Sequence, residues 1–121
     1  MRDNAPIKEN TLNLEILQKT EDLLEYLQIA LKQFPKCEKH VLAADIRARV
    51  YSVMKLIIII NKKYHKKTTM RELDTEIEML RVQVRLAKNL RYVDLKKYEV
   101  LSKKINEIGK MLGGWIKTAI S

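Results

Sequence analysis

Apolar residues recur at alternating spacings of three and four in four separate segments of this chain. Such spacing places them on one face of an α-helix, so each segment is predicted to form an amphipathic helix that packs against the others. The fold class predicted is therefore all-α. The four stripes are Leu17, Thr20, Leu24, Leu27, Leu31 and Phe34; Ala43, Ile46, Val50, Val53, Ile57 and Ile60; Met70, Leu73, Ile77, Leu80, Val84 and Ala87; and Tyr98, Leu101, Ile105, Ile108, Leu112 and Trp115.

Capping residues and a proline predict where the helices begin and end. Asn10 or Thr11 can cap the first helix, and Pro35 cannot continue it because proline lacks an amide hydrogen. Thr69 opens a Thr-Met-Arg-Glu capping box, and Asp94 can cap the last helix. After a flexible segment at residues 1–11, helices are expected at 12–34, 37–62, 70–91 and 95–118. Matched lengths and short connections predict an up-down-up-down four-helix bundle over residues 12–118.

Two of the predicted helices contain more apolar residues than a single core-facing stripe can bury. The run Leu56–Ile60 points right around its helix, and a second stripe follows the third helix. Exposed apolar strips of this kind usually make subunit contacts, although a wide core-facing stripe is the alternative. The predicted homo-oligomer interface comprises Leu56, Ile58, Ile59, Met79, Val82 and Leu86, with Leu90 extending the second stripe.

Charge adds the strongest functional signal. The 121 residues carry 24 Lys and Arg against 15 Asp and Glu, a net charge of +9. Residues 1–34 are net −2, so the positive charge is concentrated in the remainder. Such a field attracts polyanions, although a lysine-rich surface that merely keeps the protein soluble is the alternative.

Cysteine content and hydropathy favour a cytoplasmic protein. A single cysteine, Cys37, excludes an intrachain disulfide, and the first ten residues contain no apolar segment typical of a signal peptide. The longest apolar run is five residues, so no transmembrane helix is expected.

No residue pattern indicates catalysis, a metal site or a cofactor. Cys37 and His40 lie three apart, but no third catalytic group and no convincing set of further metal ligands accompanies them. Gly109 and Gly113 do not belong to a phosphate-binding loop, because no strand precedes them. Their spacing of four within a helix instead predicts that another backbone approaches closely.

Cations are arranged in three groups. Four lysines of the last helix repeat every seven residues, which keeps them along one side of a helix. A second group follows the third helix, and a third surrounds Tyr64 in a turn. Such groups bind phosphates with little sequence preference, although ordinary solvation of lysines is the alternative. The predicted nucleic-acid or partner-binding residues are Lys96, Lys103, Lys110 and Lys117; Arg81, Arg85, Lys88 and Arg91; and Lys62, Lys63, Lys66 and Lys67.

Particular strings resemble a known family. The turn Phe34-Pro35-Lys36-Cys37-Glu38-Lys39, the segment Arg91-Tyr92-Val93 and especially Gly109-Lys110-Met111-Leu112-Gly113-Gly114-Trp115 are similar to the accessory variability determinant (Avd) of diversity-generating retroelements. The resemblance implies a non-catalytic four-helix bundle that forms a ring-like pentamer. It also implies binding to the retroelement's error-prone reverse transcriptase and to template RNA or complementary DNA, in support of mutagenic retrohoming.

Two other functions stay open from the sequence. Four-helix-bundle proteins encoded in intervening sequences of 23S ribosomal RNA share the Phe-Pro-Lys turn, and they would imply nucleic-acid binding without a polymerase. A bundle that binds an acidic protein is the second alternative, because the same cations attract carboxylates.

Overall fold

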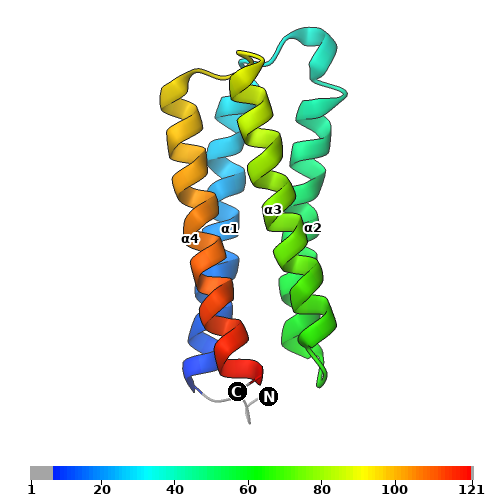
Figure 1. Cartoon of the computed structure of the whole chain (residues 1–121), viewed down its shortest axis with the longest axis vertical. Helices are drawn as coiled ribbons and strands as arrows, with labels where there is room; N and C mark the ends of the chain where they lie inside the picture. Colours follow the sequence, from blue (N-terminus) through cyan, green and yellow to red (C-terminus); the bar gives the residue numbers. More distant parts are fainter. Residues whose placement is uncertain (1–6, 121) are drawn as a thin grey trace.

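The computed structural model describes residues 7–120, and these residues form four helices that run alternately in opposite directions (Figure 1). The helices are α1 (Ile7–Leu31), α2 (Leu42–Lys62), α3 (Lys67–Asn89) and α4 (Leu95–Ile120), with a short 3₁₀ helix, η1, at Lys36–Glu38. Each helix packs on its neighbour in sequence, and α1 also packs on α4. This arrangement confirms the predicted four-helix bundle. No helix within the described range is long and apolar enough to cross a membrane.

The core contains the apolar stripes of all four helices. Every residue of the stripes predicted for α2 and α3 is buried. In the stripe predicted for α4, every residue is buried except Tyr98, which is half-buried. The stripe predicted for α1 was partly wrong, because Leu17 and Leu24 are half-buried while Ile16 and Leu23 occupy the core. Thr20 is fully buried as predicted, and its hydroxyl donates to the carbonyl of Ile16 at 2.8 Å. This bond satisfies the only polar group of that stripe.

Three predicted helix starts were wrong. The second helix was expected from residue 37, but α2 begins at Leu42, after the short helix η1 at Lys36–Glu38. The capping box at Thr69 does not form, because α3 already begins at Lys67 and the buried Thr69 hydroxyl instead accepts a bond from Lys63 Nζ at 3.0 Å. In α1, Asn10 and Thr11 lie inside the helix, which begins at Ile7. Residues 1–6 of the segment predicted to be flexible lie outside the described residues. Ser, Thr and Asn are tolerated inside helices when packing there is favourable, so a potential cap is not an obligatory start.

One end of the bundle is held together by contacts between the α1–α2 and α3–α4 connections. The rings of Phe34 and Tyr92 lie 5.4 Å apart, and the amide of Gln33 donates to Asp94 Oδ2 at 3.2 Å. Asp94 caps α4 as predicted, because its Oδ1 accepts the Lys97 backbone amide at 2.8 Å. That bond, followed by the bond from Gln33, lowers the pKa of the Asp94 carboxyl.

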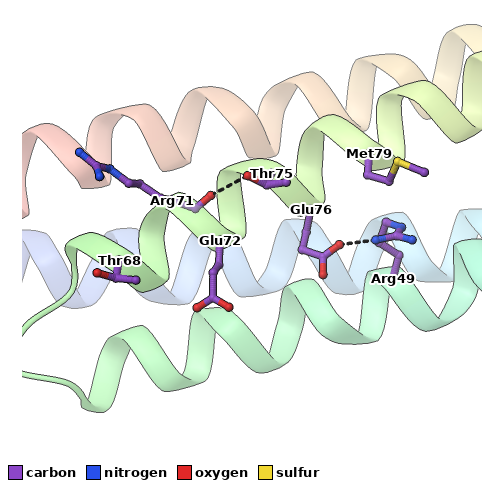
Figure 2. A pocket seen from close by; sticks show the side chains of 7 residues that line it. All are labelled: Arg49, Thr68, Arg71, Glu72, Thr75, Glu76 and Met79. Atoms are coloured by element: carbon purple, nitrogen blue, oxygen red, sulfur yellow. Dashed lines mark hydrogen bonds and ion pairs between the residues drawn. The ribbon is translucent and has the colours of Figure 1, made fainter.

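A polar network joins α2 to α3. Arg49 on α2 donates to Gln83 Oε1 at 2.9 Å, to Glu76 and to Asp45 Oδ2 at 3.2 Å. Figure 2 shows the guanidinium of Arg49 and the carboxylate of Glu76 facing each other between these helices. Desolvation by burial lowers the pKa of Arg49, but its bonds and the charges of Glu76 and Asp45 outweigh this effect and raise it overall. The side chain therefore stays charged.

Removal of Arg49 is expected to destabilise the fold. Arg49→Ala leaves the buried Gln83 amide and two carboxylates without their shared donor, which should cost about 2 kcal/mol in the free energy of unfolding. Arg47→Ala is the matched control, because Arg47 makes one exposed bond to Gln28 at 3.3 Å and should cost less than about 0.5 kcal/mol. Urea denaturation followed by circular dichroism measures both. Equal losses in the two variants would contradict this assignment.

Candidate nucleic-acid interface

A hollow in the surface between α3 and α4 brings together cations from two of the predicted groups. Arg81 from α3 and Lys103 and Lys110 from α4 line it, together with Tyr98, Glu99, Ser102 and Asn106. Three cations against one carboxylate give this hollow a formal charge of +2. Serine, asparagine and tyrosine add neutral hydrogen-bonding groups, so the lining suits a phosphodiester backbone.

Arg81 is held in this hollow by both helices. Its Nε donates to Asn106 Oδ1 at 3.0 Å and its Nη1 donates to Glu78 Oε2 at 2.5 Å. A Cβ added at Gly109 would overlap Arg81 Nη2, so the glycine provides the space in which the guanidinium crosses α4. The predicted close approach of a backbone at Gly109 is therefore wrong within this chain, and a side chain occupies the space instead. Nothing lies within 4 Å of a Cβ built at Gly113.

The basic lining continues towards the α3–α4 connection. Lys88 Nζ lies 4.6 Å from the centre of the Tyr98 ring, a cation–π contact that holds the lysine against α4. Lys88 and Arg91 also line a second hollow, together with residues of the connection. Burial, followed by the charge of Glu38, raises the pKa of the Tyr92 phenol in this hollow. Cations thus follow the α3–α4 boundary over much of its length.

Arg91 has an unusual backbone conformation. Its φ is 64°, and it is the one residue other than glycine with a positive φ in the described part of the chain. The amides of Arg91 and Tyr92 donate to the carbonyls of Lys88 and Ala87 at 2.9 and 2.8 Å. This pattern is a Schellman motif, in which glycine is normally the left-handed residue. The left-handed conformation costs an arginine more than it would cost a glycine.

Replacing Arg91 by glycine should separate stability from binding. Arg91→Gly removes the left-handed strain and is expected to raise the free energy of unfolding by up to about 1 kcal/mol. It should also weaken nucleic-acid binding a few-fold, because one cation is lost. Arg85→Ala is the control, since Arg85 is an exposed helical cation whose loss should weaken binding without a gain in stability. Denaturation and fluorescence anisotropy measure the two quantities. A less stable Arg91→Gly variant would contradict the prediction.

The lysine repeat of α4 lies on the surface. Lys96, Lys103, Lys110 and Lys117 are all exposed, and successive members are about 10 Å apart along the helix axis. Lys103 and Lys110 lie in the hollow with Arg81, whereas Lys96 and Lys117 extend the row towards the two ends of α4. The repeat and the α3 cations therefore form one surface, which we call the α3–α4 basic face: Arg81, Arg85, Lys88, Arg91, Lys96, Lys103, Lys110 and Lys117.

The third predicted group of cations lies apart from most of this face. The α2–α3 connection is at the end of the bundle where α4 finishes, whereas Arg91 and Lys96 lie at the opposite end (Figure 1). Lys62, Lys63 and Lys67 are exposed, and Lys66 is half-buried. We call residues 62–67 the tip. Of the basic face, only Lys117 lies near the same end of the bundle.

The residues predicted to form a subunit interface are mostly exposed. Met79, Val82 and Leu86 are 40 to 43% exposed on α3, and Leu90 continues this apolar strip. On α2, Ile58 is exposed, whereas Leu56 and Ile59 are half-buried. At about 100° per residue, Met79 and Leu86 lie about 140° to 160° around α3 from Arg81. The outer surface of α3 is thus divided into a basic side facing α4 and an apolar side.

A comparison with known families agrees with the resemblance found in the sequence. The sequence model of the bAvd-like family matches residues 14–119, nearly the whole chain. The chain belongs to the bAvd-like family. A search of curated proteins found no match.

In this bAvd-like protein, Cys37 and His40, which were considered for catalysis or metal binding, are both exposed. Among the side chains that the structure describes, no three His, Cys, Asp or Glu residues are grouped so that they could hold a metal ion. The hollow between α2 and α3 in Figure 2 is lined by Arg49, Arg71, Glu72 and Glu76 among others, so its formal charges cancel. It is therefore less suited to a polyanion than the basic face.

Sequence reasoning missed the partners that position the cations of this bAvd-like chain. Asn106, which holds Arg81, and Tyr98, which holds Lys88, were not predicted to belong to the site. A weak signal was present, because Tyr98, Ser102, Asn106 and Gly109 follow a helical spacing beside the lysine repeat. That spacing shows that these residues share one side of α4, but it does not show which other helix this side contacts.

Proposed function

We propose that this protein is a non-catalytic accessory subunit of a diversity-generating retroelement, which binds the error-prone reverse transcriptase and its template RNA or complementary DNA. Membership of the bAvd-like family supports the retroelement role. The observation that carries the nucleic-acid part is the α3–α4 basic face, where Arg81, Lys103 and Lys110 converge on one hollow. Polymerisation belongs to the reverse transcriptase, and this chain supplies binding surface.

Nucleic-acid binding and oligomer formation use two different surfaces. The basic face binds the sugar–phosphate backbone, since lysine and arginine release counterions from phosphates without reading bases. The apolar strip of Met79, Val82, Leu86 and Leu90 builds a ring-like homo-oligomer, which the resemblance suggests is a pentamer. Its four side chains are 40 to 47% exposed, and their burial between subunits removes apolar surface from water. The two surfaces lie on different sides of α3, so both can be occupied together.

Co-expression with a neighbouring reverse transcriptase tests the proposal. The expected result is a complex that survives affinity purification and contains RNA, with a mass, measured by native mass spectrometry, equal to one polymerase and several copies of this chain. Failure to capture a reverse transcriptase, with nucleic-acid binding retained, would instead favour the ribosomal intervening-sequence type of function. Binding of an acidic protein without RNA or DNA would contradict both.

A further inference from the structure

The tip carries the most exposed large hydrophobic side chain of the described residues. Tyr64 is 91% exposed, although tyrosine usually buries most of its ring. It lies between α2 and α3 with lysines at positions 62, 63, 66 and 67. No acidic residue occurs between Asp45 and Glu72. An exposed aromatic ring in a purely cationic stretch is the combination used for stacking on unpaired bases.

The backbone of the tip is anchored at its two ends. The Lys63 amide donates to the carbonyl of Ile60 at 3.2 Å, and the Met70 amide donates to the carbonyl of Lys66 at 2.9 Å. Lys63 Nζ also bonds to Thr69 Oγ1 at 3.0 Å. The ring of His65 meets that of Tyr64 in an edge-to-face contact, with centres 4.9 Å apart and planes at 81°. The phenol ring is thus held on a short connection, and its exposure leaves ring surface available to a ligand.

We propose that Tyr64 is a stacking platform for an unpaired base of single-stranded RNA or DNA, with the tip lysines contacting the adjoining phosphates. This inference rests on the proposed function, because it assigns a second nucleic-acid contact to the same protein. The basic face lacks an equally exposed aromatic ring and binds backbone. The tip adds the ability to distinguish a single strand from a duplex, in which bases are already stacked.

Binding of two probes by the full-length protein tests the inference. One is a single-stranded oligonucleotide with a central 2-aminopurine, and the other is the duplex of the same sequence, both at about 50 mM salt. Tyr64→Ala is expected to weaken single-strand binding roughly tenfold and leave duplex binding within about twofold. Tyr64→Phe should bind like the wild type. The 2-aminopurine fluorescence should be quenched by the wild type and not by Tyr64→Ala.

Tyr51→Ala is the matched control, since Tyr51 is a half-exposed tyrosine on α2 and its loss should change neither affinity. Single-strand affinity that is unchanged in Tyr64→Ala, or reduced equally with duplex affinity, would overturn the stacking role. So would a Tyr64→Ala defect confined to capture of the reverse transcriptase. A wild-type protein that binds neither probe would overturn the proposed nucleic-acid function itself.

Discussion

Charge reversal of the lysine repeat, Lys96, Lys103, Lys110 and Lys117 to glutamate, is expected to weaken nucleic-acid binding about 100-fold or more at low salt. The four side chains are exposed along α4, and two of them line the hollow that contains Arg81. Reversal replaces favourable phosphate contacts by repulsion and also reduces the salt dependence of binding. Fluorescence anisotropy with RNA and single-stranded DNA measures the change.

A control variant distinguishes the effect of losing the basic face from the effect of a lower net charge. Reversal of Lys32, Lys36, Lys39 and Lys55 changes the charge by the same amount, and these lysines are also exposed but lie outside α3 and α4. This control should lose much less affinity, because none of these lysines lines the hollow that contains Arg81, and charges outside the contact with phosphates are screened. Helicity should be unchanged in both variants. Equal losses would show that net charge alone attracts the ligand, which would contradict the assignment to the α3–α4 basic face.

Truncation of Trp115 should have the largest effect on stability. Trp115 is fully buried in the core near the end of α4, and Trp115→Ala is expected to cost about 3 to 5 kcal/mol in the free energy of unfolding. The indole Nε1 has no hydrogen-bond partner among the described residues. Urea denaturation followed by circular dichroism measures the loss.

A Trp115→Phe variant distinguishes the contribution of ring packing to stability from the cost of the unpaired indole N–H. Trp115→Phe keeps an aromatic ring in the core and removes the buried N–H, whose desolvation costs about 1 to 3 kcal/mol. This variant should therefore lose far less stability than Trp115→Ala. A loss in Trp115→Phe as large as that in Trp115→Ala would show that the indole nitrogen is needed in the folded protein, and the packing explanation would be wrong.

Helical periodicity predicted the cores of α2, α3 and α4 because the core-facing residues of each helix keep an unbroken alternation of three and four spacings. It failed in part for α1, where Ile16 adjoins Leu17 and Leu23 adjoins Leu24. Two adjacent apolar residues both fit a stripe, and only packing against α2 and α4 decides which one is buried. Local signals also misplaced the start of α3, since Thr69 can cap a helix but is buried inside one.

The candidate site was predictable to the level of individual helix faces. A seven-residue repeat placed the lysines of α4 along one exposed side, and the strip of Met79, Val82 and Leu86 proved exposed. The contact of Arg81 with Asn106 and the space at Gly109 were not predictable, because they depend on the rotation and offset of α3 against α4. The left-handed conformation of Arg91 was not predictable either, because the usual sequence signal for it is a glycine.

The most direct test of the account is the salt dependence of nucleic-acid binding by the purified wild-type protein. If the basic face contacts at least four phosphates, the logarithm of the binding constant should fall linearly with the logarithm of salt concentration between about 50 and 200 mM, with a slope near −3 or steeper. Absence of binding to both RNA and DNA at about 50 mM salt, with and without the reverse transcriptase, would contradict the account.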